Sequence, residues 1–204
     1  MKFVRKLYDW MLHWANTPFG PAALFLLAVA ESSFFPIPPD ALLIALALGM
    51  RAKSFKFAFL CAAGSIIGAL IGYGIGYYLW WSGESAFSGI AEFFFKHVPG
   101  FSESVFYRIQ SKFEIWNFWI VFTAGFTPIP FKVFTISAGA FDVNLLMFLI
   151  ASTISRSARF FLVGLLIWKY GDPIRGFIDK YFNTLAVVFI ILLFCGFMFV
   201  KYLI

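Results

Sequence analysis

Residues 57–80 carry no charged side chain, and this run constrains the possible folds of the chain more than any other feature. A helix needs about 20 consecutive apolar residues to cross ~30 Å of hydrocarbon. Residues 143–168 and 182–200 are also long enough, although the former run contains Arg156 and Arg159. Of the 204 residues, 62% are hydrophobic and 13% charged, against about 25% charged residues in ordinary soluble domains. The sequence therefore predicts a single all-α polytopic membrane domain over residues 1–204, with transmembrane helices at 57–80, 143–168 and 182–200.

Four other apolar runs are too short to cross a membrane, and each pair is interrupted by a Pro-Ile-Pro motif. Residues 18–30 and 41–50 flank Glu31, Pro36, Pro38, Pro39 and Asp40. Residues 115–126 and 133–141 flank Pro128, Pro130 and Lys132. Each arm rises only ~15–20 Å as a helix, and proline removes a backbone donor and blocks the preceding turn. This pattern predicts re-entrant hairpins at 18–50 and 118–141 with the prolines at their tips; a kinked full-length span is the alternative for each.

The two halves of the chain correspond, because each predicted hairpin is followed by a long apolar helix. If both hairpins re-enter, a single span separates them and they approach from opposite faces of the membrane. The fold predicted is thus an inverted repeat of hairpin plus transmembrane helix, an arrangement that commonly frames a transport site near the midplane. An interfacial amphipathic helix at 1–16, linker helices at 81–117 and the C-terminal helix complete it. Close helix packing through small residues is expected at Gly64, Gly68, Gly72 and Gly76.

Basic residues gather on one side of this topology. Six fall before residue 57, namely Lys2, Arg5, Lys6, Arg51, Lys53 and Lys56, while the linker has three, namely Lys96, Arg108 and Lys112. The positive-inside rule then places the N-terminus in the cytoplasm.

Catalytic and metal-binding constellations are missing from the sequence. The histidines, His13 and His97, lie in amphipathic or linker segments, and no acidic residues stand at metal-ligand spacing. Cys61 and Cys195 lie in apolar runs, which favours buried thiols over a disulfide or a metal pair. We therefore expect no enzyme activity, no cofactor, no metal and no nucleic-acid partner.

Five ionisable residues remain at membrane depth: Glu31, Asp40, Lys132, Arg156 and Arg159. Each costs roughly 2.5–3.5 kcal/mol at a helix centre, so such residues usually face a cavity, pair with one another, or serve a function.

The basic members of this group suggest a phosphate ligand. Arg156 and Arg159 share a helix face with Ser152 and Ser155, and guanidinium groups bind phosphate bidentately. We assign lipid-phosphate binding to Lys132 and the two arginines, and ion pairing or proton coupling to Glu31 and Asp40. Alternatively, the five residues form buried ion pairs that fix the hairpins to the spans.

Three motifs, "ESSFFPIPPD", "FTPIPFKVFTISAG" and "SRSARF", resemble the DedA family, whose core is also called the SNARE-associated or VTT domain. The similarity covers roughly residues 7–168, and the YqaA-like bacterial branch is the most similar. The resemblance implies a multi-pass bacterial inner-membrane protein with two opposed re-entrant hairpins. It also implies flipping or scrambling of a lipid such as undecaprenyl phosphate or a phospholipid, with dependence on the proton gradient in several members.

Family roles carry over only where the residues match. Glu31 and Asp40 correspond to acids around the first hairpin, and Lys132 stands where many relatives have arginine. Those relatives have another arginine ahead of the second motif, where this chain has Ala124, Gly125 and Phe126. This departure leaves the lipid open. A proton-coupled small-cation or drug transporter and a non-transporting membrane scaffold remain alternatives, and a homo-oligomer is compatible with each.

Overall fold

The computed structural model describes residues 17–34, 37–83, 86–97, 102–127, 130–171 and 173. Within these ranges the chain is helical and has no strand, only an isolated bridge between Trp81 and Phe87. The predicted all-α class is confirmed for this part. The helices expected at 1–16 and 182–200 lie outside the described residues.

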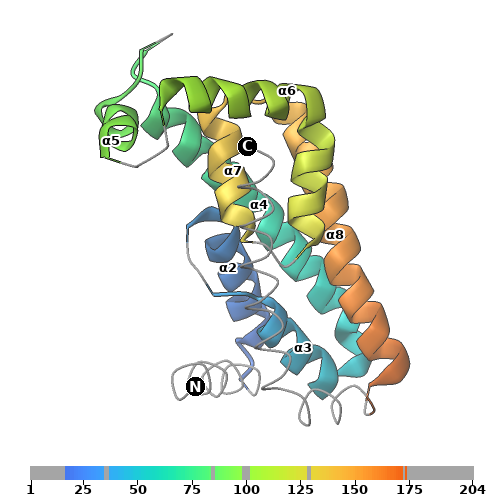
Figure 1. Cartoon of the computed structure of the whole chain (residues 1–204). Helices are drawn as coiled ribbons and strands as arrows, with labels where there is room; N and C mark the ends of the chain where they lie inside the picture. The colour runs from blue at the N-terminus through green and yellow to red at the C-terminus, as the bar shows by residue number, and fades with distance from the viewer. Residues whose placement is uncertain are drawn as a thin grey trace.

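The first helical hairpin consists of α2 (Gly20–Ser33) and α3 (Asp40–Gly49). Pro21 stands in the first turn of α2, where a missing amide donor costs nothing. The helix ends at Ser33, and α3 begins directly after Pro39 with the acidic side chain of Asp40 at its positive end. In Figure 1 the chain runs up α2, turns, and comes back down α3 in the lower half of the molecule.

Two long helices run through the molecule in opposite directions. Helix α4 (Ser54–Trp80) follows the short 3₁₀ helix η1 (Arg51–Lys53), and α8 (Leu145–Tyr170) begins where the side chain of Asn144 accepts a hydrogen bond from the Met147 amide. Both are long and apolar enough to cross a membrane, judged by length and composition. They correspond to the predicted spans at 57–80 and 143–168.

The second hairpin differs from its prediction in one respect. Helix α5 (Gly89–His97) precedes α6 (Glu103–Phe126), which is continuous across the boundary expected between linker and hairpin at residues 117 and 118. No proline interrupts α6, and its single glycine, Gly125, lies at its end. The helix therefore continues through this boundary, and Figure 1 shows it first running along the top and then turning downward. Helix α7 (Phe131–Ala140) returns upward.

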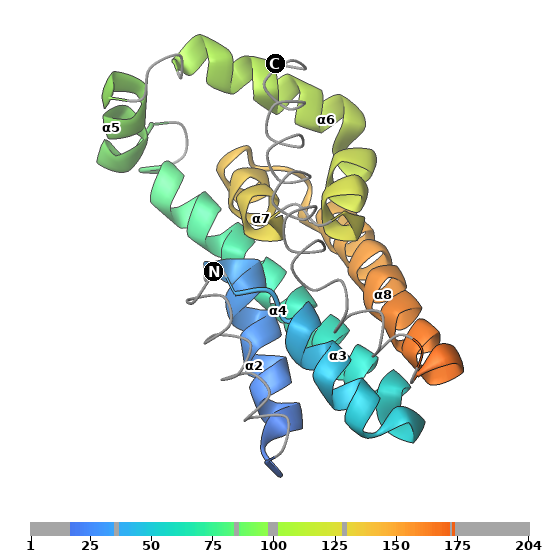
Figure 2. The ribbon, with the colours of Figure 1, turned by 60° about the horizontal axis from the view of Figure 1, so that its bottom comes forward.

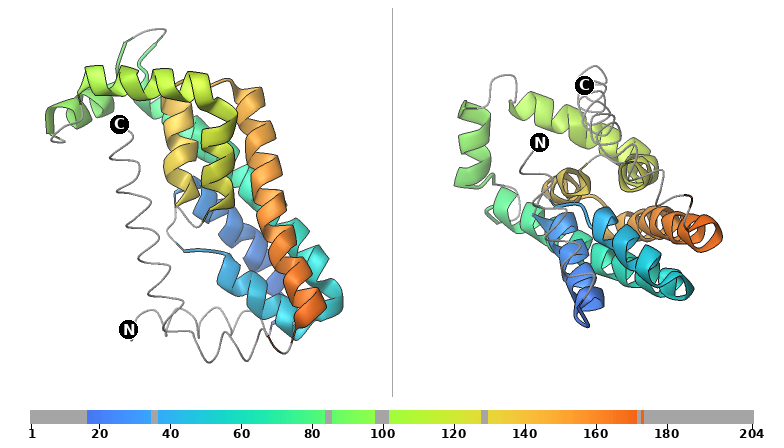
Figure 3. Two further views of the ribbon diagram at one scale, coloured as in Figure 1. Left: turned by 45° about the vertical axis from the view of Figure 1, so that its right-hand side comes forward. Right: turned by 90° about the horizontal axis from the view of Figure 1, so that it is seen from below.

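The two hairpins point at each other. In Figure 2 and in the left view of Figure 3, the turn between α2 and α3 and the turn between α6 and α7 both lie near the middle of α4 and α8. Two separate apolar cores follow this division. One joins Leu24, Leu43 and Leu46 of the first hairpin to Phe57 and Phe160. The other joins residues of α6 and α7 to the opposite halves of the long helices, including Val121, Phe131, Ala138, Ala69 and Phe148.

The predicted glycine packing is confirmed. A Cβ atom on Gly64 or Gly68 would meet backbone carbonyls of α2, and one on Gly76 would meet the Ile136 carbonyl of α7. From the other side, a Cβ on Gly139 would meet the Tyr73 carbonyl. These glycines allow α4 to lie against both hairpins at backbone contact distance.

Candidate functional site

Four of the five charged residues singled out in the sequence come together where the first hairpin meets α8. Glu31 lies in the last turn of α2, Asp40 is the first residue of α3, and Arg156 and Arg159 lie one turn apart on α8. We call these four residues the charge cluster. Its side chains are largely buried, with exposed fractions of 2% for Arg156, 13% for Glu31, 16% for Arg159 and 23% for Asp40.

Arg156 is enclosed on several sides. Its Nη2 donates to Oε2 of Glu31 at 2.7 Å, and its Nε donates to the Ser65 hydroxyl of α4 at 2.6 Å. The guanidinium carbon lies 4.9 Å from the ring centre of Phe131 and 4.6 Å from that of Phe160. Such cation–π contacts gain strength where water is excluded, so the planar group is held by charge and by aromatic faces together.

Serine hydroxyls extend this contact into a small polar network. The Ser32 hydroxyl donates to Oε2 of Glu31 at 3.1 Å and lies 2.6 Å from the Ser65 hydroxyl. Both serines are fully buried. A buried hydroxyl needs a hydrogen-bond partner, but the sequence did not indicate which residues would be the partners of these two serines.

Arg159 connects both hairpins. Its Nη2 lies 3.0 Å from each Asp40 carboxylate oxygen, and its Nε donates to Oδ1 at 3.2 Å. Its Nη1 donates to the Thr127 carbonyl, just past the end of α6, at 2.6 Å. A direct contact between hairpins lies nearby, because the Thr135 hydroxyl of α7 donates to the Ser32 carbonyl at 2.9 Å.

Two serines expected beside the arginines have different roles. The Ser155 hydroxyl donates to the Ser152 carbonyl of its own helix at 3.2 Å, while the buried Ser152 hydroxyl has no hydrogen-bond partner in the described structure. Ser65, on a helix antiparallel to α8, supplies the hydroxyl that binds Arg156. The expected face of arginines and hydroxyls from one helix is therefore replaced by groups from different helices.

Lys132 lies apart from the charge cluster. It is the second residue of α7 and is partly exposed. Within the described part of the chain its ammonium group makes neither an ion pair nor a hydrogen bond. The five residues are two acids and three bases, and both acids pair with arginines, so the uncompensated positive charge belongs to this lysine.

The predicted hairpin tips are described in part. Pro39 is buried and Pro38 partly exposed at the turn of the first hairpin, and Pro130 is exposed directly before α7. Pro36 and Pro128 lie outside the described residues. Each tip is therefore followed closely by a charged residue. Asp40 comes directly after Pro39 in the first hairpin, and Lys132 comes two residues after Pro130 in the second.

The guanidinium groups of the charge cluster are already bound to carboxylates. Both guanidinium groups have the planar arrangement of donors that binds carboxylate or phosphate. A phosphate could take the place of a carboxylate only if the acid moved away or became protonated, because two anions would otherwise compete for the same donors.

Comparisons with known proteins identify relatives of this chain. No family model matches it, and no solved structure matches it. It is 36% identical over 182 residues to an uncharacterized protein of Haemophilus influenzae, in a match that covers 88% of each chain. It is 38% identical over 163 residues to an uncharacterized protein of Histophilus somni, with 80% of each chain covered. The chain therefore belongs to the protein family of these two relatives.

Proposed function

We propose that this protein is a DedA-type carrier of the bacterial inner membrane that moves a phosphate-bearing lipid between leaflets. The observation that carries the proposal is the buried charge cluster between two opposed helical hairpins, together with a lysine at the second tip that has no partner among the described residues. The motifs around both prolines and around Arg156 supply the family resemblance.

Membrane insertion is supported by the surface of the long helices. Besides their length and composition, both expose large apolar side chains along most of their length, among them Phe59, Ile67 and Ile71 on α4 and Ile154, Leu162 and Leu166 on α8. Contiguous apolar surface of this kind needs a partner, and lipid acyl chains provide one. Helices α2 and α3, with 14 and 10 residues, rise only ~21 and ~15 Å and would enter and leave on one side.

The proposed orientation places the base of the first hairpin in the cytoplasm. Arg51, Lys53 and Lys56 lie at this end, where the positive-inside rule favours them. The second hairpin would then enter from the opposite face.

The charge cluster gives this carrier a headgroup path. An ionised phosphate crossing hydrocarbon needs protein groups in place of water. Lys132 would meet it first, because its ammonium group has no partner to displace among the described residues, and the two arginines would follow. Glu31 and Asp40 hold the arginines between turnovers, and their protonation would free guanidinium donors for phosphate. This exchange offers a direct route to proton coupling.

A non-transporting scaffold is the second candidate, and the same contacts favour it. Each arginine pairs with an acid, and Arg159 also binds the second hairpin. Such pairs could serve only to fix the hairpins against α8. The third candidate is a proton-coupled carrier of small cations or drugs, with Glu31 and Asp40 as its carrier acids.

Reconstitution distinguishes these functions. The full chain is placed in liposomes containing fluorescently tagged phospholipid, and a membrane-impermeant quencher reports how much lipid reaches the outer leaflet. Parallel vesicles carry tagged undecaprenyl phosphate or a cation-sensitive dye. We expect transfer of a phosphate lipid without cation flux. Cation flux without lipid transfer would support the cation carrier, and neither activity would support the scaffold.

A further inference from the structure

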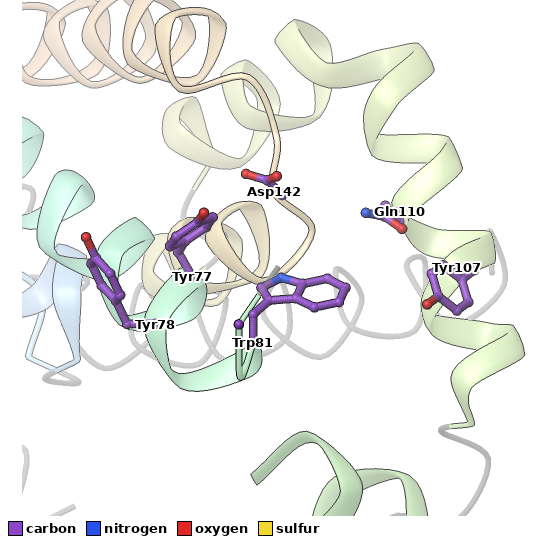
Figure 4. A pocket seen from close by; sticks show the side chains of 7 residues that line it. Tyr77, Tyr78, Trp81, Tyr107, Gln110 and Asp142 are labelled. Atoms are coloured by element: carbon purple, nitrogen blue, oxygen red, sulfur yellow. The ribbon is translucent and has the colours of Figure 1, made fainter. Parts of the chain in front are cut away.

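A cavity of about 510 Å³ lies away from the charge cluster, at the C-terminal end of α4. It is lined by side chains from α4, α6 and the turn between α7 and α8: Tyr77, Tyr78, Trp81, Tyr107, Gln110 and Asp142. Figure 4 shows Asp142 near Tyr77 and Trp81, with Gln110 and Tyr107 facing them from α6. Tyr77 is about 18 Å along the helix from Ser65 of the cluster network, so the two sites are separate. The volume falls within the range of ligand pockets, roughly 300–1,000 Å³.

Side-chain hydrogen bonds hold the turn that carries Asp142. Trp81 Nε1 donates to the Ala140 carbonyl at 2.9 Å, and Gln110 Nε2 donates to the Phe141 carbonyl at 2.9 Å. The Tyr73 hydroxyl donates to the Val143 carbonyl at 2.6 Å. The wall of the cavity is therefore fixed from two helices, and the position of Asp142 is built into the fold.

The cavity is anionic and aromatic, although the protein as a whole has a net charge of +6. Among the described residues that line it, Asp142 is the only charged one. Within the described part of the chain its carboxylate has neither an ion pair nor a hydrogen bond. Three tyrosines and a tryptophan also line the cavity, and aromatic faces attract organic cations.

Simpler explanations account for parts of this arrangement. Tyrosine and tryptophan gather at membrane interfaces in general, but a belt of this kind requires neither a cavity nor a carboxylate. Asp142 has a φ of 50°, a conformation that aspartate adopts more readily than most residues. Asparagine adopts it as readily, so the backbone does not require the negative charge.

We propose that this cavity binds an organic ammonium group, held between the Asp142 carboxylate and the rings of Tyr77, Trp81 and Tyr107. The group could belong to the headgroup of a lipid such as phosphatidylethanolamine or to a small free molecule such as choline. The site does not depend on the transport proposal, and either can fail without the other.

Binding of choline tests the free ligand. The full chain, in nanodiscs of phosphatidylglycerol, is titrated with choline and with its neutral isostere 3,3-dimethylbutan-1-ol. Choline should bind about tenfold more tightly, because only the cation gains from the rings and the carboxylate. Asp142→Asn keeps the turn conformation and should remove this preference, as should Tyr107→Leu, whose side chain is half exposed. Glu103 is an exposed acid on the same helix as Tyr107, so Glu103→Gln is the matched control and should leave the preference for choline unchanged.

Native mass spectrometry tests the lipid source. Delipidated protein is mixed with equal amounts of phosphatidylethanolamine and phosphatidylglycerol, and the retained lipids are counted. Retention of phosphatidylethanolamine that is lost in Asp142→Asn assigns the site to a lipid headgroup; choline binding alone assigns it to a free ligand. If the variants bind both ligands as the wild type does, or if the alcohol binds as well as choline, the proposal is wrong. Tyr107→Leu gives the same answer should Asp142→Asn fail to fold.

Discussion

At the scale of single residues, the chain keeps each buried guanidinium group beside a carboxylate from a distant segment. Arg156 and Glu31 are 125 positions apart in sequence, and Arg159 and Asp40 are 119 apart. The sequence indicated that these residues needed partners, because unpaired charges in an apolar chain are costly. It did not indicate which acid meets which base, since that depends on how α2, α3 and α8 cross. The contributions of Ser65 and of the Thr127 carbonyl were missed for the same reason.

The Arg156–Glu31 pair should show strong energetic coupling. Arg156→Ala leaves the Glu31 carboxylate largely buried with only a hydroxyl partner, so we expect a loss of about 3–5 kcal/mol in the free energy of unfolding. Arg156→Met combined with Glu31→Leu should cost much less, because no charge is left unpaired. Denaturant unfolding of the full chain in detergent measures both. Arg108→Ala, at an exposed position on α6, is the control and should stay within about 0.5 kcal/mol. Simple additivity of the single substitutions would show that the pair is not coupled.

At the scale of helices, the proline motifs predicted where the chain turns, and α2, α3 and α7 begin or end beside them. The boundary expected at residues 117 and 118 does not exist, because α6 continues through it as one helix without a helix-breaking residue. The glycines of α4 predicted close packing, but the sequence alone could not assign Gly64 to α2 and Gly76 to α7. That assignment depends on which hairpin lies against each half of α4.

Helix packing against α4 provides a matched pair of substitutions. Gly76→Ala would drive a methyl group into the Ile136 carbonyl, whereas Gly74→Ala adds one where no atom lies within 4 Å. We expect Gly76→Ala to destabilise the protein by about 1–3 kcal/mol. Gly74→Ala should stabilise it by about 0.5–1 kcal/mol, since alanine favours helix. Thermal unfolding of both variants checks this, and equal effects would mean that α7 does not approach α4 so closely.

The hairpin topology is testable by labelling. Single cysteines replace Pro18, Ala52 and Glu103, all exposed, in a background without Cys61 and Cys195. A membrane-impermeant thiol reagent should reach Pro18→Cys and Ala52→Cys from the same side, because the first hairpin enters and leaves on one face. Glu103→Cys should react from the opposite side. Labelling of the first two positions from opposite sides would indicate a kinked span.

At the scale of the whole molecule, two opposed hairpins divide the protein into two apolar cores with the charge cluster where their tips approach each other. This arrangement suits a carrier in which one half rocks against the other around a fixed site. Polar contacts join the halves at the tips, among them the Thr135 hydroxyl with the Ser32 carbonyl and Arg159 with the Thr127 carbonyl.

Lys132 gives the most direct test of the proposed headgroup path, because structural and transport roles separate at this residue. Its ammonium group has no partner in the described part of the chain, so Lys132→Gln should leave the free energy of unfolding within about 0.5 kcal/mol of wild type. Lys56→Gln removes the same charge from an exposed position at the start of α4 and serves as the control. The measurement is the rate at which proteoliposomes transfer tagged phosphate lipid between leaflets. The account predicts a large decrease for Lys132→Gln and a wild-type rate for Lys56→Gln; wild-type transfer by a stable Lys132→Gln protein would contradict it.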